Sequence, residues 1–226
     1  MKKLLVNEKL TEEQIKQFES FSDSFEVTFD LNEKDAEILV GKFSPAQCKE
    51  YPNLELLLTT AVGYDNYIKK GVLPENTILC NAVDAHTEEV AEHVFATMVS
   101  MTKNLHLYRD VQKKHLWYDE GVTKSICDLT VVILGLGNIG KYLAQMCKRQ
   151  GMYVIGVKRN LNDKPDYVDE LYNLDKLDEI LPRVDAVLSV LPSTKETFHI
   201  FTKERFELMK KDAILVNAGR GDLIDT

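Results

Sequence analysis

The sequence is poor in the features that mark several classes of protein. It has only 11 Gly and 6 Pro among 226 residues, and 44% of its residues are apolar. Because disordered chains are enriched in Gly, Pro and polar residues, we expect a folded chain. Basic residues are outnumbered, with 28 Lys and Arg against 36 Asp and Glu and a net charge of −8. Nucleic acids and anionic membranes attract basic faces, so we expect neither as a partner.

Long apolar runs and cysteine motifs are also scarce. The first ten residues, MKKLLVNEKL, hold too short an apolar stretch for a signal peptide, and no run reaches the length that spans a membrane. The cysteines form no C-x-x-C pair and have no His at metal-binding spacing; they are Cys48, Cys80, Cys127 and Cys147. We therefore expect a cytoplasmic location, no metal site, and cysteines that are reduced and mostly buried.

What the sequence does contain is an alternation of strand and helix patterns. In the first half, strands are expected at 2–6, 24–29, 36–41, 54–58 and 77–81, with a helix at 11–18 that begins behind Thr11. A longer helical pattern covers residues 88–112, and strands resume after residue 128. This alternation predicts an α/β fold of parallel βαβ units in two domains, residues 1–95 and residues 96–226.

The strongest motif lies in the second half. A predicted strand, Val131 to Leu134, runs into a G-x-G-x-x-G turn, a helix, and a further strand, Val154 to Val157. Glycines at a strand-to-helix turn can be a packing solution alone, but here both flanking elements that a dinucleotide site needs are present. The turn and the helix N-terminus would hold a pyrophosphate through backbone amides. The predicted residues are Gly135, Gly137, Asn138, Ile139 and Gly140.

The end of the second strand bears on which dinucleotide is bound. NAD sites of this type usually place Asp or Glu there for the ribose 2′-hydroxyl, whereas this chain has Lys158, Arg159 and Asn160. A guanidinium can bind a 2′-phosphate through two hydrogen bonds, which favours NADP over NAD. The alternative is that Lys158 and Arg159 are solvated surface charges.

The final forty residues make the pattern specific. VLPSTKET, Val190 to Thr197, and MKKDAILVNAGRG, Met209 to Gly221, resemble the signatures of the D-isomer-specific 2-hydroxyacid dehydrogenase family. TTAVGYDN, Thr59 to Asn66, is similar to the family's substrate loop, and Trp117 to a Trp after its interdomain helix. The resemblance implies a flavodoxin-like substrate domain and a Rossmann dinucleotide-binding domain, both doubly wound around parallel sheets.

The resemblance also implies a reaction and its residues. A hydride would pass between NAD(P)H and a small 2-oxo acid, giving a D-2-hydroxy acid. Arg220 would bind the substrate carboxylate and polarise the carbonyl, and the amides of Val62 and Gly63 would hold the same carboxylate. The residues expected to line the cofactor are Leu191, Pro192, Thr197 and Ala218. Relatives of this kind look like dimers, so a homodimer is expected, with an exposed stripe that includes Met98, Met101 and Leu105.

The resemblance leaves two roles unfilled. The family uses a general-acid His and a Glu that orients it, both downstream of the R-G motif, and none of the five histidines here has a matching context. The end of the sequence therefore reads as a truncation, with Asp225 or Thr226 as the N-cap of a further helix and an incomplete dinucleotide-binding domain whose strand Ala213 to Val216 has an exposed edge. The alternative function is an inert remnant that at most binds a nucleotide or a partner subunit.

Overall fold

The computed structural model describes residues 1–225 and shows two compact units. The first is Met1–His86, and the second begins at Thr87. This division precedes the predicted boundary at residue 95, which falls inside helix α3 (Thr87–Thr102). The candidate N-cap Thr226 lies outside the described residues, and so does the first residue of a helix that Asp225 would cap.

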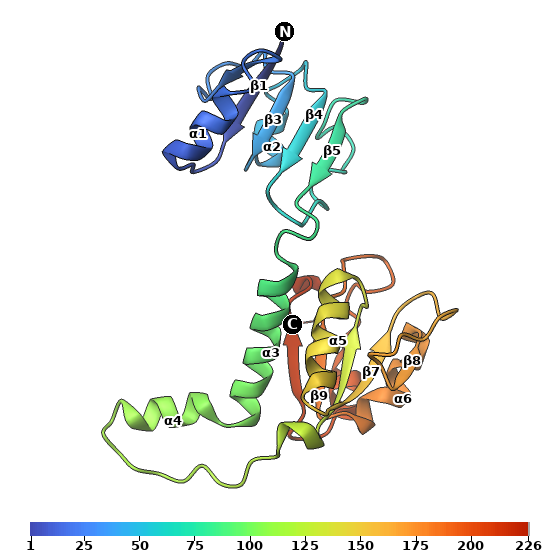
Figure 1. Ribbon diagram of the computed structural model, residues 1–226. Helices are drawn as coiled ribbons and strands as arrows, with labels where there is room; N and C mark the ends of the chain where they lie inside the picture. Colours follow the sequence, from blue (N-terminus) through green and yellow to red (C-terminus); the bar gives the residue numbers. More distant parts are fainter. Residues whose placement is uncertain (226) are drawn as a thin grey trace. The chain divides into compact units, whose positions relative to one another are not determined.

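The first unit is built on a five-stranded parallel sheet with the strand order β2-β1-β3-β4-β5 (Figure 1). This is the flavodoxin-like order, and it confirms the expected class of the first domain. The five strands match the predicted ones within two residues at each end: β1 (Lys2–Asn7), β2 (Phe25–Thr28), β3 (Ile38–Gly41), β4 (Leu56–Thr59) and β5 (Ile78–Asn81).

Helix α1 (Glu12–Glu19) confirms the predicted N-cap. The Thr11 hydroxyl accepts a hydrogen bond from the Gln14 amide at 3.3 Å, and the Gln14 side chain accepts one from the Thr11 amide at 2.9 Å. Side chains alternate between the two faces of the sheet, so that Leu5 packs in the cluster with α2 (Pro45–Cys48) and its neighbours Leu4 and Val6 pack in the other.

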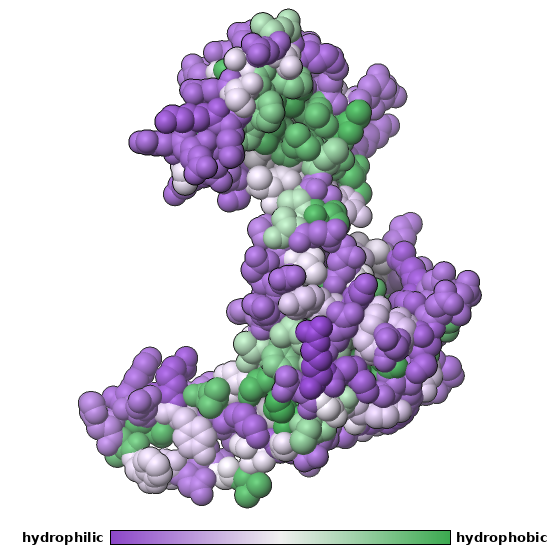
Figure 2. Space-filling model, in the orientation of Figure 1, coloured by the Kyte–Doolittle hydropathy of each residue, from purple (hydrophilic) through white to green (hydrophobic). Residues whose placement is uncertain are grey.

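One face of the first unit carries exposed apolar side chains. Figure 2 shows a group of apolar residues on that unit. The exposed apolar side chains of its strands include Leu58 in β4 and Ile78 in β5, the latter 62% exposed. The strand β5 lies at the edge of the sheet formed by the described residues. The sheet is therefore less covered toward β5 than at its centre.

The second unit has a five-stranded parallel sheet in the order β10-β9-β6-β7-β8. Read from β8 to β10, with β6 counted as strand 1 of the unit, the order is 3-2-1-4-5. This is the order of Rossmann domains, and it confirms the expected class. Its strands are β6 (Thr130–Leu134), β7 (Tyr153–Val157), β8 (Glu170–Tyr172), β9 (Ala186–Ser189) and β10 (Ile214–Asn217). As expected for the strand at 213–216, β10 forms one edge of the sheet within residues 1–225, and its side chains are half-buried.

Helices cover both faces of the second sheet. On one face α3 packs against α5 (Asn138–Arg149), and Ala91, Val94 and Met98 are buried there with Leu143 and Cys147. On the other face lie α6 (Leu177–Ile180) and the 3-10 turns Leu174–Lys176 and Leu181–Arg183, and α7 (Lys203–Leu208) follows. Burying a large apolar side chain contributes about 1.5–3 kcal/mol, so these two layers supply most of the unit's stability.

The single helix predicted over residues 88–112 is wrong. The chain forms α3 and a second helix, α4 (Leu105–Gln112), with a break at Asn104, which adopts φ 54°. Asn tolerates this left-handed conformation better than most residues. The Asn104 side chain donates to the Glu120 carbonyl at 3.2 Å, and the Lys103 ammonium donates to the Lys124 carbonyl at 2.6 Å. These tertiary hydrogen bonds stabilise the break over a continuous helix.

Three further expectations concern exposure. Met98 is fully buried, so the predicted exposed stripe is wrong at that residue, although Met101 and Leu105 are exposed. All four cysteines are free; Cys48 and Cys147 are buried as expected, whereas Cys80 and Cys127 are exposed. Burial raises the pKa of the Cys147 thiol to about 12.

No helix among the described residues is long and apolar enough to cross a membrane.

Candidate functional site

The predicted site residues fall into two groups, one in each unit. Val62 and Gly63 follow β4 in the first unit. All others lie in the first turn of α5 or in loops after β6, β7, β9 and β10, at the carboxyl edge of the second sheet, where ligands bind in folds of this kind. These are Gly135, Gly137, Asn138, Ile139, Gly140, Lys158, Arg159, Asn160, Leu191, Pro192, Thr197, Ala218 and Arg220.

The glycine turn after β6 leaves no room for side chains at two of its three positions. Gly135 has φ 96°, a conformation that side chains rarely adopt. A Cβ on Gly140 would lie 1.8 Å from the Gly135 carbonyl oxygen, whereas a Cβ on Gly137 would have no described atom within 4 Å. Gly137 is the N-cap of α5 and, as a glycine, has no side chain to cap the helix. The N-terminal amides of a helix are suited to bind an anion, here one that approaches over Gly137.

The turn lies between β6 and β9, where the direction of the strand order reverses. The Val190 amide donates to the Leu134 carbonyl at 3.0 Å, and a Cβ on Gly135 would lie 3.4 Å from the Leu191 side chain. Val190 and Leu191 thus border the glycine turn. Thr197 is 4% exposed, and its hydroxyl donates to the Pro192 carbonyl at 2.6 Å, so its hydrogen bond holds the shape of this loop.

The three residues after β7 have different contacts. The Lys158 ammonium donates to the Asp163 carbonyl at 2.9 Å, and the Asn160 side chain accepts from the Asn162 amide at 2.9 Å, so both hold the local loop. The Arg159 guanidinium instead lies 3.2 Å from the Glu196 carboxylate in the loop after β9. Sequence analysis missed Glu196, because a single Glu in a polar segment carries no sign of a contact with a distant loop.

The loop after β10 presents Arg220. The Asn217 side chain donates to the Arg220 carbonyl at 2.8 Å and accepts from the Gly219 amide at 3.1 Å. A Cβ on Gly219 would lie 2.3 Å from the Leu191 carbonyl oxygen, so the loops after β9 and β10 touch through backbone. Sequence analysis missed Asn217 and Gly219, although Asn often bonds the backbone two residues on and could have been identified on that ground.

The residues that follow Arg220 form hydrogen bonds with the segment after β9. The Ser193 hydroxyl donates to the Asp222 carboxylate at 2.6 Å, and the Phe201 amide donates to the Leu223 carbonyl at 2.9 Å. Leu223 is fully buried. The His199 side chain is 41% exposed, and its Nδ1 lies 3.5 Å from the Asp225 carboxylate.

The predicted substrate loop of the first unit makes hydrogen bonds to residues at the ends of two other strands, β5 and β1. The Asn81 side chain, at the end of β5, donates to the Val62 carbonyl at 2.7 Å. The Thr60 hydroxyl donates to the Glu8 carboxylate at 2.8 Å, and this hydrogen bond is the main cause that lowers the pKa of Glu8. Val62 is 37% exposed, so this loop lies at the surface. The hydrogen bond from Asn81 fixes the orientation of the Val62 carbonyl there.

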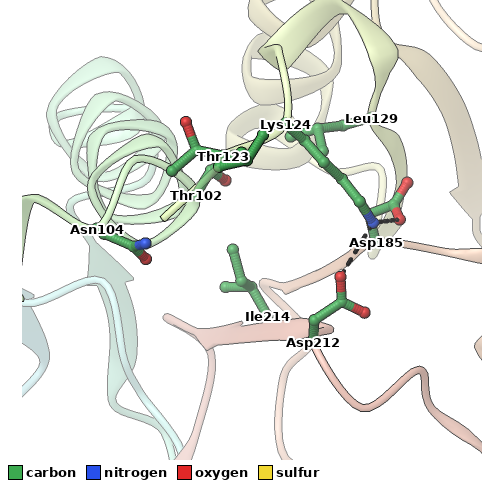
Figure 3. A pocket seen from close by; sticks show the side chains of 9 residues that line it. Thr102, Asn104, Thr123, Lys124, Leu129, Asp185, Asp212 and Ile214 are labelled. Carbon is green, nitrogen blue, oxygen red and sulfur yellow. Dashed lines mark hydrogen bonds and ion pairs between the residues drawn. The ribbon is translucent and has the colours of Figure 1, made fainter. Parts of the chain in front are cut away.

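At the edge of the second sheet where the strands begin, ion pairs hold the end of a segment that we call the arm and define as residues 105–122. Figure 3 shows Lys124, directly after the arm, pointing to Asp185 and Asp212, from which its ammonium lies 2.9 Å and 3.1 Å. They border a cavity of about 290 Å³ that is also lined by Thr102, Asn104 and Ile214. Burial works to raise the pKa of Asp185, but hydrogen bonds from the Thr130 amide, Lys124 and Lys210 outweigh it and lower the pKa.

The arm itself carries large exposed apolar side chains. Trp117 is fully exposed, and Leu116, Tyr118 and Leu105 are more than half exposed. Monomeric proteins rarely expose such a group of large apolar side chains together.

Taken together, the second unit is a Rossmann domain with a dinucleotide-type glycine turn at its strand reversal and an arginine loop at the same edge. Residues 95–226 match the model of the D-isomer specific 2-hydroxyacid dehydrogenase, NAD binding domain. The chain belongs to this family, and its second unit is an NAD-binding domain. Among residues 1–225 no group of three His, Cys, Asp or Glu side chains is placed to hold a metal ion.

Three relatives illustrate the similarity. The chain is 29% identical to glyoxylate reductase of Thermococcus onnurineus, over 99% of this chain and 73% of the relative. It is 30% identical to D-3-phosphoglycerate dehydrogenase of Methanocaldococcus jannaschii, over the whole chain but 45% of the relative. A D-isomer specific 2-hydroxyacid dehydrogenase family protein from Aeromonas salmonicida has a similar structure, with a TM-score of 0.82, 30% identity, and coverage of 99% of this chain and 74% of that one.

Proposed function

We propose that this chain acts in an NAD(P)-dependent oxidoreductase that interconverts a small 2-oxo acid and a D-2-hydroxy acid. The observation that carries the proposal is the placement of the glycine turn, Gly135 to Gly140, and of Arg220 at the same edge of one sheet. A dinucleotide site and a cation suited to a carboxylate are thus provided by adjacent loops. Family membership supports the same class of reaction.

The glycine turn fits a dinucleotide. The open space over Gly137 and the α5 N-terminus would hold the pyrophosphate, and Leu191, Pro192 and Ala218 would border the rest of the cofactor. We propose NADP as the preferred form, with NAD as the alternative, because Arg159 follows β7 where NAD sites usually carry an acid. Its side chain is 75% exposed and can reorient toward a 2′-phosphate.

Arg220 is the proposed catalytic residue. Its guanidinium would bind the substrate carboxylate and stabilise the negative charge that develops on the carbonyl oxygen during reduction. A bound nicotinamide supplies the hydride. The Asn217 hydrogen bond to the Arg220 carbonyl fixes the backbone that carries this side chain. A preorganised donor of this kind contributes about 10²–10³-fold to turnover in enzymes that stabilise an oxyanion.

Val62 and Gly63 are proposed as carboxylate-binding residues through their amides. The Asn81 hydrogen bond to the Val62 carbonyl supports this role, because it orients the peptide group of the loop. Tyr64 is 46% exposed in the same loop and would restrict the space beside the substrate. A small 2-oxo acid such as glyoxylate, hydroxypyruvate or pyruvate is the proposed substrate.

We propose a homodimer that uses the arm. Both ends of the arm are fixed by hydrogen bonds, from Asn104 to Glu120 and from Lys103 to Lys124, while Trp117 and Leu116 stay exposed. Because the arm is held at both ends and exposes apolar side chains, it is suited to burial against a second copy of the chain. Sedimentation equilibrium should give a dimer for the wild type and a monomer for Trp117→Glu; a monomeric wild type would exclude the proposal.

Two assays on the purified chain test the proposed reaction. Isothermal titration should show NADP⁺ binding, and the loss of absorbance at 340 nm with glyoxylate, hydroxypyruvate or pyruvate measures NADPH oxidation. Because none of the five histidines matches the family's general acid, oxidation is expected only from a protein that also carries that His and its Glu, and not from residues 1–226 alone. In such a protein, Arg220→Gln should lower turnover about 10²-fold or more while NADP⁺ binding persists. Arg149→Gln, at the exposed end of α5, is the matched control and should leave both unchanged.

The same assays decide between this proposal and the alternative. Binding of NADP⁺ with no turnover of glyoxylate, hydroxypyruvate or pyruvate, even in a protein that carries the general-acid His and its Glu, would favour a nucleotide-binding chain without catalysis. Absence of NADP⁺ and NAD⁺ binding would refute the proposed function altogether.

A further inference from the structure

The Arg159–Glu196 ion pair links two loops at the proposed cofactor site. Arg159 follows β7 and Glu196 follows β9, and these strands flank β6, which carries the glycine turn. Both side chains are largely exposed, at 75% and 69%. An exposed ion pair contributes little to the free energy of unfolding. A stabilising role therefore does not explain why this pair lies at the proposed cofactor site.

The backbones on both sides of the pair are held in place. The Thr194 amide donates to the Thr197 hydroxyl at 2.8 Å, across the residues that include Glu196. On the other side the Lys158 amide donates to the Tyr172 carbonyl at 3.0 Å and the Lys158 ammonium binds the Asp163 carbonyl. The two charges therefore meet because the loops place them together.

We propose that Glu196 is a specificity-determining residue that weakens the preference for NADP over NAD; this inference rests on the proposed function. A 2′-phosphate must take the Arg159 guanidinium from the Glu196 carboxylate, and it must also approach that negative charge. The 2′-hydroxyl of NAD needs neither step. Glu196 therefore penalises NADP selectively and leaves NAD binding unchanged.

The decisive experiment measures dissociation constants for NADP⁺ and NAD⁺ by isothermal titration at low salt. Glu196→Gln keeps the shape of the side chain and removes its charge. It should tighten NADP⁺ binding about fivefold, equivalent to about 1 kcal/mol, and leave NAD⁺ binding unchanged. Because the pair is exposed, the gain should shrink at about 0.5 M salt.

Two further variants isolate the cause. Glu207→Gln removes the same charge from α7, where Glu207 pairs only weakly with Lys203 at 4.0 Å among the described contacts, and it should change neither constant. In an Arg159→Gln background, Glu196→Gln should lose most of its effect, because the competition for the guanidinium is gone.

The outcomes separate this inference from the proposed function. If Arg159→Gln weakens NADP⁺ selectively while Glu196→Gln leaves the ratio of the two constants unchanged, the inference is overturned and NADP binding through Arg159 stands. An equal change for both nucleotides on Glu196→Gln also overturns it. A wild-type chain that binds neither nucleotide overturns both.

Discussion

Gly140→Ala tests whether the glycine turn is limited by backbone contact. The added Cβ would lie 1.8 Å from the Gly135 carbonyl oxygen and 2.9 Å from its carbonyl carbon. Both are backbone atoms in a turn at φ 96°, so they cannot swing aside as a flexible side chain would. Overpacking of this kind costs about 1–3 kcal/mol or more, while the higher helix propensity of Ala returns about 1 kcal/mol. We expect a net loss of about 2 kcal/mol.

The assay is urea unfolding followed by circular dichroism, with nucleotide binding measured in parallel. With a slope of about 2 kcal/mol per molar urea, the expected loss lowers the midpoint by about 1 M. Gly137→Ala is the matched control, since its Cβ would have no described atom within 4 Å. It should cost less than about 1 kcal/mol as an N-cap change, yet it should weaken dinucleotide binding by filling the space over the turn.

Two results would refute this reasoning. One is Gly140→Ala with the stability of the wild type, which would mean that the contact with Gly135 does not limit the turn. The other is Gly137→Ala with unchanged nucleotide affinity, which would mean that the pyrophosphate does not approach at that position.

Other perturbations have equally definite expectations. Asn104→Ala should lower the free energy of unfolding by about 1–2 kcal/mol, because Ala is disfavoured at φ 54°; Asn104→Gly should cost less, and equal costs would count against the explanation. Met98→Ala should lose about 2–5 kcal/mol from the core, measured by urea unfolding, and a loss under 1 kcal/mol would show that the site is not tightly packed. The Arg183 hydrogen bond lowers the pKa of Glu170 from 4.5 to about 2, so its stabilising effect is present above pH 4.5 and is lost as the pH falls toward 2. Arg183→Gln should flatten that part of the stability profile, and identical profiles for the two proteins would contradict this assignment.

The sequence was most informative where one local pattern determines one element. The strand from Val131 to Leu134, the glycine turn and the N-cap at Thr11 could all be predicted, because hydrophobic periodicity and backbone chemistry are local properties. The residues of the loops after β9 and β10 were identified through their resemblance to the family signatures. The structure shows that these loops lie at one edge, because parallel strands point the same way.

What the sequence could not show depends on contacts between distant residues. The break at Asn104 is stabilised by a hydrogen bond to Glu120, and the helical pattern on either side contains no sign of it. Met98 is buried because α5 packs on the α3 face that carries it, which an apolar stripe alone cannot distinguish from a dimer surface. Glu196 was missed because its relevance lies in Arg159, a residue from another loop.

The parallel sheet of the second unit separates two surfaces by strand polarity. Every strand ends at the edge that carries the glycine turn and Arg220, while Lys124 joins the arm to Asp185 and Asp212, which precede β9 and β10 at the starting edge (Figure 1). Under the proposed function, substitutions on the arm should alter assembly while nucleotide affinity stays constant, and loop changes at the other edge should alter cofactor choice without disturbing assembly. Selection, or an engineer, could then vary each proposed property independently.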